Sequence, residues 1–269
     1  MQVCLYTPGL KDHDGSHSDN LGDLIIQEAV CREVTALFER VEISKLPSHK
    51  FPKSEHMPFI KKCDLALVGG SNLLESRMNV HKKWKVSFQQ QMFSPKPVLL
   101  GVGWRVYQDS PNLYTRIFLQ QVLSKRWYHS VRDSYSLQQV KAAGVKNVIN
   151  TGCPTMWPFV NFDFGKIPCD KAGTALATVT DYAADPSADR QLLALLAENY
   201  DNVLLWPQGS GDRDYLSSLI LGLAGPFRLL EHSFTAFQEL LASDLSFDHV
   251  GTRLHGGIKC LLSGRRSLT

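Results

Sequence analysis

Short apolar and β-branched runs alternate with segments of helical spacing along this 269-residue sequence. Most of the runs end in Gly, Pro, Asn or Asp, the residues that stop a strand. We expect strands at residues 2–7, 41–46, 63–70, 97–104, 127–133, 147–152, 174–182, 202–209, 227–232 and 247–255. Strands that alternate with helices form parallel sheets covered by those helices, so the pattern predicts an α/β fold.

The segments between the runs predict helices. Residues 21–41 place six apolar side chains near one helical face, namely Leu24, Ile25, Ala29, Val30, Val34 and Leu37. A shorter helix begins near Ser134 and is stopped by Gly144. Further helices are expected near 187–199, 212–223, 233–243 and 256–263.

A change of composition divides the chain. Residues 153–173 contain three prolines and two glycines without a clean period, which is typical of a connecting segment. We therefore expect two Rossmann-like domains, residues 1–155 and 174–269, joined by a linker at 156–173 and facing a central cleft. A single doubly wound sheet is the alternative. In both cases ligands bind outside the carboxyl ends of the strands.

Composition narrows the class of protein. With 43% hydrophobic and 20% charged residues the chain resembles an ordinary globular protein. A net charge of +3 without a basic run gives no sign of a nucleic-acid partner. The six scattered cysteines lack C-x-x-C or zinc spacing, so free thiols are expected. Without a signal peptide or an apolar run near ~18 residues, we expect a cytoplasmic protein with no transmembrane segment.

Polar residues follow several of the predicted strands. Asn20 and Asp23 open the first long helix, where they either face a ligand or simply cap the helix. Gly70, Ser71 and Asn72 follow an apolar run, and this stretch either approaches a ligand closely or makes a tight turn. It lacks the G-x-G-x-x-G order, so a dinucleotide receives little support.

Two further places carry charge. Arg132 ends a predicted strand, and Asp133 or Ser134 after it can cap a helix. His13, Asp14, His17 and Asp19 form a local polar cluster, which reads as a loop over the cleft rather than as a metal site. No metal ligand set is predicted.

The strongest motif closes the chain. If Arg253 and His255 lie on a strand at i and i+2, they project to the same side, and Leu254 turns into the core. Gly256 and Gly257 then open a helix whose amide groups can bind an anion. A guanidinium, an imidazole and these amides suit a carboxylate or phosphate beside a proton donor. The alternative is a histidine that is merely hydrogen-bonded within a strand.

The ordered motifs NLGD, DLALVGGSNLL, LLGVG, SVRDSYS, GVKNVINTGCPTMW and GTRLHGGIKCLLSGRRSL resemble the polysaccharide pyruvyl transferase family over nearly the whole chain. The resemblance implies a GT-B-like fold and transfer of pyruvyl from phosphoenolpyruvate to a sugar of a polysaccharide or its precursor, usually as a ketal. It implies that His255 is catalytic and that Arg132 and Arg253 bind phosphoenolpyruvate, which is a co-substrate, so no cofactor is needed.

With these roles in place, we expect Gly256 and Gly257 to lie at the donor. Asn20, Asp23, Gly70, Ser71 and Asn72 are expected to bind the acceptor, which is a sugar, an oligosaccharide or a lipid-linked glycan. A lipid-linked acceptor would bring the cytoplasmic protein to the inner face of the membrane. The acceptor sugar, its linkage positions, the ketal stereochemistry and the oligomeric state are not predicted.

Two departures and two alternatives accompany the resemblance. Cys153 stands where many relatives have an aspartate, so any role of that aspartate does not carry over. The chain ends fourteen residues after His255, so the second domain is expected to be truncated. The alternative functions are a GT-B-type glycosyltransferase that uses a nucleotide sugar and a non-catalytic glycan-binding member of the family.

Overall fold

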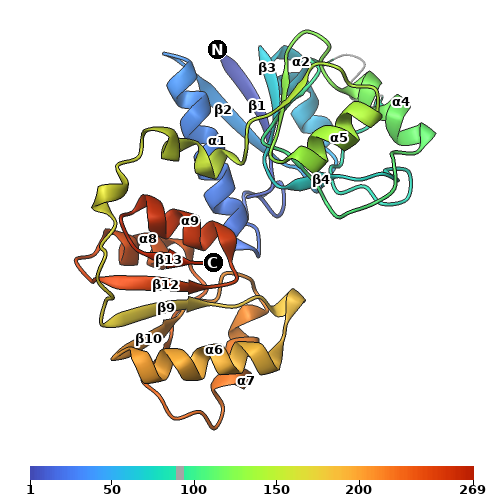
Figure 1. The fold of residues 1–269 in the computed structure, drawn as a ribbon. Coiled ribbons are helices and arrows are strands. Elements are labelled where there is room, and N and C mark those ends of the chain that lie inside the picture. The colour runs from blue at the N-terminus through green and yellow to red at the C-terminus, as the bar shows by residue number, and fades with distance from the viewer. Residues whose placement is uncertain (89–93) are drawn as a thin grey trace. The chain divides into compact units, whose positions relative to one another are not determined.

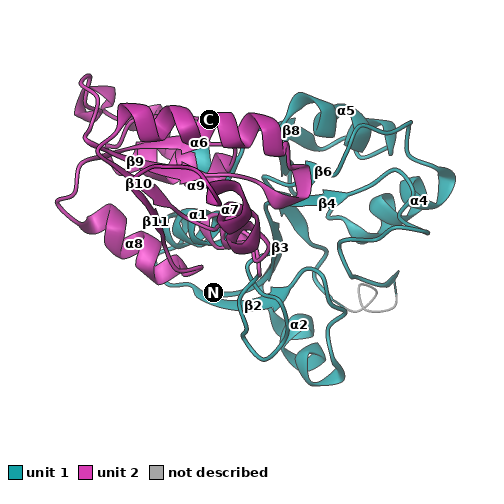
Figure 2. Ribbon diagram, turned by 90° about the horizontal axis from the view of Figure 1, so that it is seen from below, with its two compact units in different colours: residues 1–18, 26–157 teal, residues 19–25, 158–269 magenta. Residues whose placement is uncertain are grey.

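The computed structural model describes residues 1–88 and 94–269, which form two compact units (Figure 2). Unit 1 contains residues 1–18 and 26–157, and unit 2 contains residues 19–25 and 158–269. Each unit is built on a parallel sheet with helices. The α/β class predicted from the alternation of strands and helices is therefore confirmed.

The sheet of unit 1 has four parallel strands in the order β2 (Glu42–Pro47), β1 (Gln2–Thr7), β3 (Leu65–Gly69) and β5 (Val98–Leu100). Unit 1 also contains two separate two-stranded parallel sheets. These are β4 (Asn72–Leu74) with β6 (Gly103–Trp104), and β7 (His129–Val131) with β8 (Val148–Asn150). The Leu99 amide donates to His129 Nδ1 at 3.1 Å and thereby ties β5 to β7.

Both faces of this sheet are covered. Strand residues alternate between the faces, as the two-residue period of a strand requires. On one face Val3 and Leu5 pack against Val30 and Val34 of α1 (Leu21–Leu37). The other face carries Cys4 and Tyr6, which share a core with residues of α2 (Met57–Lys62), α4 (Leu113–Val122) and α5 (Ser134–Ala142).

The sheet of unit 2 has five parallel strands in the order β11 (Phe227–Leu229), β10 (Asn202–Leu205), β9 (Thr174–Thr178), β12 (Phe247–Gly251) and β13 (Ser267–Leu268). Figure 1 shows α6 (Pro186–Asn199) and α7 (Asp212–Ile220) on one side of it, and α8 (Phe234–Ala242) and α9 (Leu254–Leu262) on the other. Short 3₁₀ helices cover Ser54–His56, Pro154–Asn161, Phe164–Lys166 and Asp181–Ala183.

The first turns of α1 belong to unit 2. Leu21, Leu24 and Ile25 pack with Trp206 and Phe237 in the core beneath α8. The Leu21 amide also donates to the carbonyl of Gln208 at 2.9 Å. The boundary predicted as a single cut in sequence therefore misses the segment 19–25, because one long helix supplies apolar side chains to both units.

Several predicted details are wrong. The run 97–104 is two strands, interrupted at Gly101, whose φ is +66°. Leu37 was placed on the apolar face of α1 but is 72% exposed, because it lies in the last turn. The run 247–255 ends as a strand at Gly251.

Among the described residues, no helix combines the length and the apolar composition that a membrane span requires.

Candidate functional site

Three loops of unit 2 meet at Asp212, the first residue of α7, which is fully buried. The loops follow β9, β10 and β12, so they lie at the carboxyl ends of parallel strands, where α/β proteins bind ligands. Asp212 Oδ2 accepts hydrogen bonds from the amides of Gln208 at 3.1 Å and Gly209 at 2.7 Å. Asp212 Oδ1 accepts one from the amide of Asp181 at 3.1 Å. The carboxylate thus joins two of the loops directly.

Arg253 connects the third loop, which follows β12, to Asp212. Its Nε donates to Asp212 Oδ2 at 2.9 Å and to the carbonyl of Val179 at 3.2 Å. Its Nη2 donates to Asp212 Oδ1 and, at 3.1 Å, to Asp181 Oδ1. The side chain is only 3% exposed and lies over the ring of Tyr182. A bidentate ion pair of this kind fixes both the position and the orientation of the guanidinium.

One nitrogen of this guanidinium is left over. None of the residues 1–88 and 94–269 accepts a hydrogen bond from Nη1 of Arg253, since its hydrogen bonds to the protein all come from Nε or Nη2. The arginine is therefore held by the protein on one side and retains a donor on the other. That arrangement suits an anionic ligand.

The local geometry at Arg253 and His255 differs from the sequence prediction. Arg253 precedes α9 with φ −91° and ψ 88°, and His255 is the second residue of that helix. The i and i+2 argument for a strand is therefore wrong here. Leu254, expected in the core, is 54% exposed. The strand stops early because Gly251, with φ +153°, turns the chain against the carbonyl of Thr178.

The start of α9 has no side-chain cap. The first amide bonded within the helix is that of Gly257, which donates to the carbonyl of Arg253 at 3.2 Å. Earlier amides of the first turn, including that of Gly256, point along the helix axis toward its N-terminus, where the helix dipole favours an anion. His255, half-buried, lies within this turn.

Gly256 and Gly257 also have a packing role. A Cβ atom at Gly256 would lie 2.9 Å from Gln208 Oε1 and 3.2 Å from the ring of Trp206. A Cβ atom at Gly257 would lie 3.1 Å from His249 Cε1. The two glycines thus allow α9 to approach the strand ends closely.

His249 lies behind Gly257 and is fully buried. Its Nε2 is 3.0 Å from Thr178 Oγ1 and its Nδ1 is 2.9 Å from Ser267 Oγ. Burial lowers the pKa of His249 to about 4, so the ring is neutral at neutral pH. This histidine supports the site from the core.

Asn20 lies in the segment 19–25, which belongs to unit 2. Its Oδ1 accepts hydrogen bonds from the Gly22 amide at 3.2 Å and from Gln208 Nε2 at 3.3 Å. The first of these bonds is the helix cap that was one of its two predicted roles. Asp23, one turn along, is in unit 2 as well. Gln208 Oε1 is buried without a hydrogen-bond partner among the described residues.

In unit 1, Gly70 and Ser71 form a tight turn between β3 and β4, with φ values of 66° and 61°. The Gly70 amide donates to the carbonyl of Leu100 at 2.8 Å, and the carbonyl of Ser71 accepts from the Gly103 amide at 2.8 Å. These backbone groups therefore hold neighbouring strands together.

Asn72 and Arg132 both lie against Gly103. A Cβ atom at Gly103 would overlap Asn72 Oδ1 and lie 2.6 Å from Arg132 Nε. Asn72 Oδ1 is buried and has no hydrogen-bond partner among the residues described. Arg132 is partly exposed, with Nε 3.6 Å from Asp133 Oδ2. Asp133 caps α5 by accepting from the Ser136 amide at 2.6 Å, as predicted.

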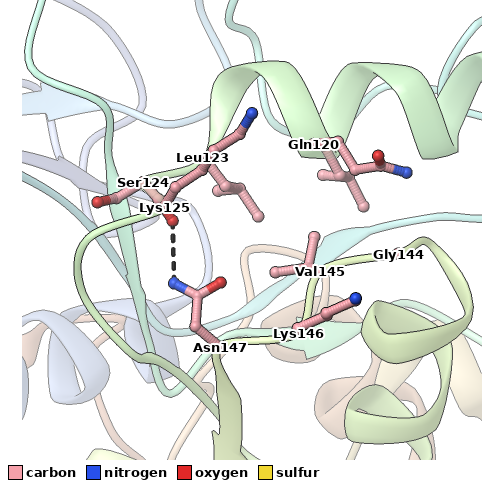
Figure 3. Close-up of a pocket in the computed structure, with 9 residues that line it drawn as sticks. Gln120, Leu123, Ser124, Lys125, Gly144, Val145, Lys146 and Asn147 are labelled. Carbon is pink, nitrogen blue, oxygen red and sulfur yellow. Dashed lines mark hydrogen bonds between the residues drawn. The ribbon is translucent and has the colours of Figure 1, made fainter.

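A cavity of about 240 Å³ in unit 1 lies elsewhere (Figure 3). It is lined by Ser124, Lys125, Lys146 and Asn147, and Asn147 Nδ2 donates to the carbonyl of Ser124 at 3.1 Å. These residues precede β7 and β8, so the cavity lies at the amino ends of these strands, whereas Arg132 follows the carboxyl end of β7. It is separate from the candidate site. Within the described ranges, no three His, Cys, Asp or Glu side chains are grouped to hold a metal.

The sequence prediction missed Asp212, Asp181 and Gln208. Asp212 stands in the first turn of a predicted helix, where an acidic residue is ordinary. Gln208 and Asp181 follow predicted strands without any motif. No signal in the sequence marks these three residues as partners of Arg253 or Asn20.

The fold and this cluster define an α/β protein with a buried, ion-paired arginine at the carboxyl edge of a parallel sheet. Residues 20–269 match the model of the polysaccharide pyruvyl transferase family. The chain therefore belongs to that family, which is a family of enzymes, as the motif series predicted. Comparison with curated proteins and with solved structures found no significant match.

Proposed function

We propose that this enzyme transfers the pyruvyl group of phosphoenolpyruvate to a sugar of a polysaccharide or its precursor and forms a pyruvate ketal. The family assignment supports pyruvyl transfer to a polysaccharide. The observation that carries the choice of donor is Arg253, pinned by Asp212 beside His255 at the uncapped start of α9.

Phosphoenolpyruvate has a carboxylate and a phosphate, and both are recognised well by guanidinium groups. We assign Arg253, through Nη1, and the first turn of α9 at Gly256 and Gly257 to the donor. Arg132 is assigned to the same donor. Because Asp212 holds Arg253 before substrate arrives, little reorganisation is needed as charge develops. The GT-B-like architecture is part of the proposal.

The chemistry requires a proton at the methylene carbon of phosphoenolpyruvate. Protonation converts this carbon to a methyl group and makes C2 electrophilic. A sugar hydroxyl then forms a bond to C2 and loses its proton, and the C2–O bond to phosphate breaks with its electron pair leaving on phosphate. A second hydroxyl adds to C2, loses its proton and closes the ketal. We assign these proton transfers to His255.

The acceptor is assigned to Asn20, Asp23, Gly70, Ser71 and Asn72, and is a sugar, an oligosaccharide or a lipid-linked glycan. Asn72 has a buried side-chain oxygen without a protein partner among the described residues. The same is true of Gln208, whose Nε2 donates a hydrogen bond to Asn20. Such an oxygen can accept a hydrogen bond from a sugar hydroxyl. We also propose that the enzyme works in the cytoplasm, at the inner membrane face when its acceptor is lipid-linked.

A thermal-shift comparison tests the donor. Phosphoenolpyruvate should raise the melting temperature, because a ligand that binds the native state stabilises it. The shift should fall strongly in Arg132→Gln and persist in Arg116→Gln, which removes an exposed arginine on α4. Stabilisation by nucleotide sugars instead of phosphoenolpyruvate would point to the alternative, a nucleotide-sugar glycosyltransferase.

A further inference from the structure

A second cavity of about 500 Å³ in unit 1 is strongly basic. Its lining includes four cationic side chains, Lys82, Lys83, Lys85 and Arg105, together with His49 and His81. We call this cavity the basic pocket. The net charge of the whole chain is only +3, so this concentration of positive charge is local.

The basic pocket lies where three strands of unit 1 end. Glu75, which also lines it, directly follows β4, and Arg105 directly follows β6. His49 comes two residues after β2 ends at Pro47. The carboxyl ends of β2, in the four-stranded parallel sheet, and of the parallel pair β4 and β6 therefore lead to this pocket, and such strand ends are the position of ligand sites in α/β folds.

The positive charge of the pocket is largely uncompensated. Glu75 is the single carboxylate among its described lining residues; it is buried, and its Oε1 is 3.1 Å from Arg105 Nη1. Across residues 1–88 and 94–269, neither Lys83 nor Lys85 has an ion-pair partner. Lysines gathered without carboxylates repel one another, and an anion relieves that repulsion.

The loop that carries the lysines is anchored. Trp84, between Lys83 and Lys85, is fully buried and packs edge-on against Tyr6 at 6.5 Å between ring centroids. The Lys85 amide donates to the carbonyl of Ser48 at 2.8 Å. The cationic side chains therefore extend from a fixed backbone, which lowers the entropy lost when a ligand binds.

Lys82 is partly drawn into the protein. Its Nζ lies 3.8 Å from the ring centroid of Phe118 and donates to the carbonyl of Val86. Burial lowers the pKa of Lys82 to about 8, with the charge of Lys85 as a smaller cause. A bound anion would favour the charged form of this lysine.

We propose that the basic pocket binds the diphosphate that joins the acceptor glycan to its carrier. Compact ammonium groups suit phosphoryl oxygens, and a diphosphate has enough charge to engage several lysines at once. The cavity is within the size range of small-molecule sites. The assignment to the acceptor rests on the proposed function, whereas the affinity for a diphosphate does not.

Calorimetric titration with inorganic pyrophosphate tests the affinity. The variant Lys83→Gln/Lys85→Gln should bind pyrophosphate at least about tenfold more weakly than the wild type, since each lost phosphate contact costs about 1 kcal/mol or more. The matched control is Lys125→Gln/Lys146→Gln, which removes two lysines from the cavity at the opposite sheet edge of the same unit. The control should bind as the wild type does. Absence of binding to the wild type, or equal weakening in both variants, would overturn the proposal.

Transfer assays identify the carrier. The same glycan is supplied on a nucleoside diphosphate, on a polyprenyl diphosphate, and without any carrier. The basic-pocket variant should raise the KM at least about tenfold for one or both diphosphate acceptors relative to the carrier-free glycan, with the KM for phosphoenolpyruvate as internal reference. Unchanged ratios in an active enzyme would contradict the proposal. If no acceptor is pyruvylated but pyrophosphate binding still depends on Lys83 and Lys85, the proposed function fails and the diphosphate site stands.

Discussion

The two units hold the cations that we assign to ligands in opposite ways. In unit 2, Arg253 is 3% exposed and contacts the carboxylates of Asp212 and Asp181. In unit 1, Lys83 is exposed, and neither it nor Lys85 has an ion-pair partner within the described ranges. Arg253 is part of the folded structure and has its position before any ligand arrives. No protein carboxylate in the described ranges pairs with the charge of the two lysines, so an anionic ligand can do so.

This difference predicts separate consequences for stability and for binding. Removing one member of a buried ion pair leaves the other charged and unpaired in the interior, which costs stability. Removing an exposed lysine changes stability little but weakens the binding of an anion. Substitutions in the buried ion pair of unit 2 should therefore lower stability, and substitutions of the lysines of unit 1 should weaken anion binding.

The largest effect on stability is expected for Asp212→Ala. Arg253 would lose the carboxylate that pairs with it in bidentate fashion. The amides of Gln208, Gly209 and Asp181 would lose their acceptor. We expect a loss of about 3 to 5 kcal/mol in the free energy of unfolding. Urea unfolding followed by circular dichroism measures it.

The matched control is Asp214→Ala, which removes an exposed aspartate from the same first turn of α7. It should change stability by less than about 1 kcal/mol, because only a dipole interaction is lost. Equal stability losses in the two variants would show that the Arg253 cluster is not a structural ion pair.

A smaller effect is expected from acid acting on His249. The pKa of this histidine is about 4 in the folded protein, against its ordinary value of 6.5. As the pH falls from 6.5 toward 4, the unfolded chain binds a proton that the folded chain does not. Stability is therefore complete above pH 6.5 and is lost by roughly 3 kcal/mol on reaching pH 4.

Urea unfolding at several pH values compares the wild type with His249→Gln. The variant is expected to be less stable at pH 7, because both hydroxyl contacts of the ring change, but to lose less stability on acidification. Burial also lowers the pKa of His129 in unit 1, and this histidine is the same in the wild type and in the variant. An identical pH profile for wild type and His249→Gln would contradict a neutral, buried His249.

The smallest effect on stability is expected for Lys83→Gln/Lys85→Gln. Neither lysine has an ion-pair partner in the part of the chain described, so the free energy of unfolding should change by less than about 0.5 kcal/mol. The loss of repulsion with Lys82 and Arg105 should even offset part of any lost packing. A stability loss comparable to that of Asp212→Ala would remove the contrast between the units.

Much of the fold was predictable because its signals are local. Each of the ten expected strands overlaps an observed one, and the helices of unit 2 begin within two residues of their predicted starts. The segment 19–25 was not predictable in this way. Its apolar residues continue the same helical pattern as the rest of α1, and only the tertiary structure shows that they pack on Trp206 and Phe237.

The sequence singled out Arg253 and His255 but neither their geometry nor the residues that hold Arg253. A run of apolar residues leading into Gly251 reads as a strand through His255, and only the close approach of Gly251 to Thr178 shows why it ends earlier. Asp212 is an acidic residue in a helical first turn, and its bond to Arg253, 41 residues away, leaves no trace in local sequence. The approach of both Asn72 and Arg132 to Gly103 is equally non-local.

The most direct test of the central claim is phosphate release from phosphoenolpyruvate in the presence of an acceptor glycan. The wild-type enzyme should release phosphate only when the glycan is present, and the glycan should gain pyruvate in equal amount. His255→Ala should keep the wild-type melting temperature within a few degrees and lose about 10² to 10⁴ of the rate. Near-wild-type release by His255→Ala, or release that does not depend on the glycan, would contradict the account.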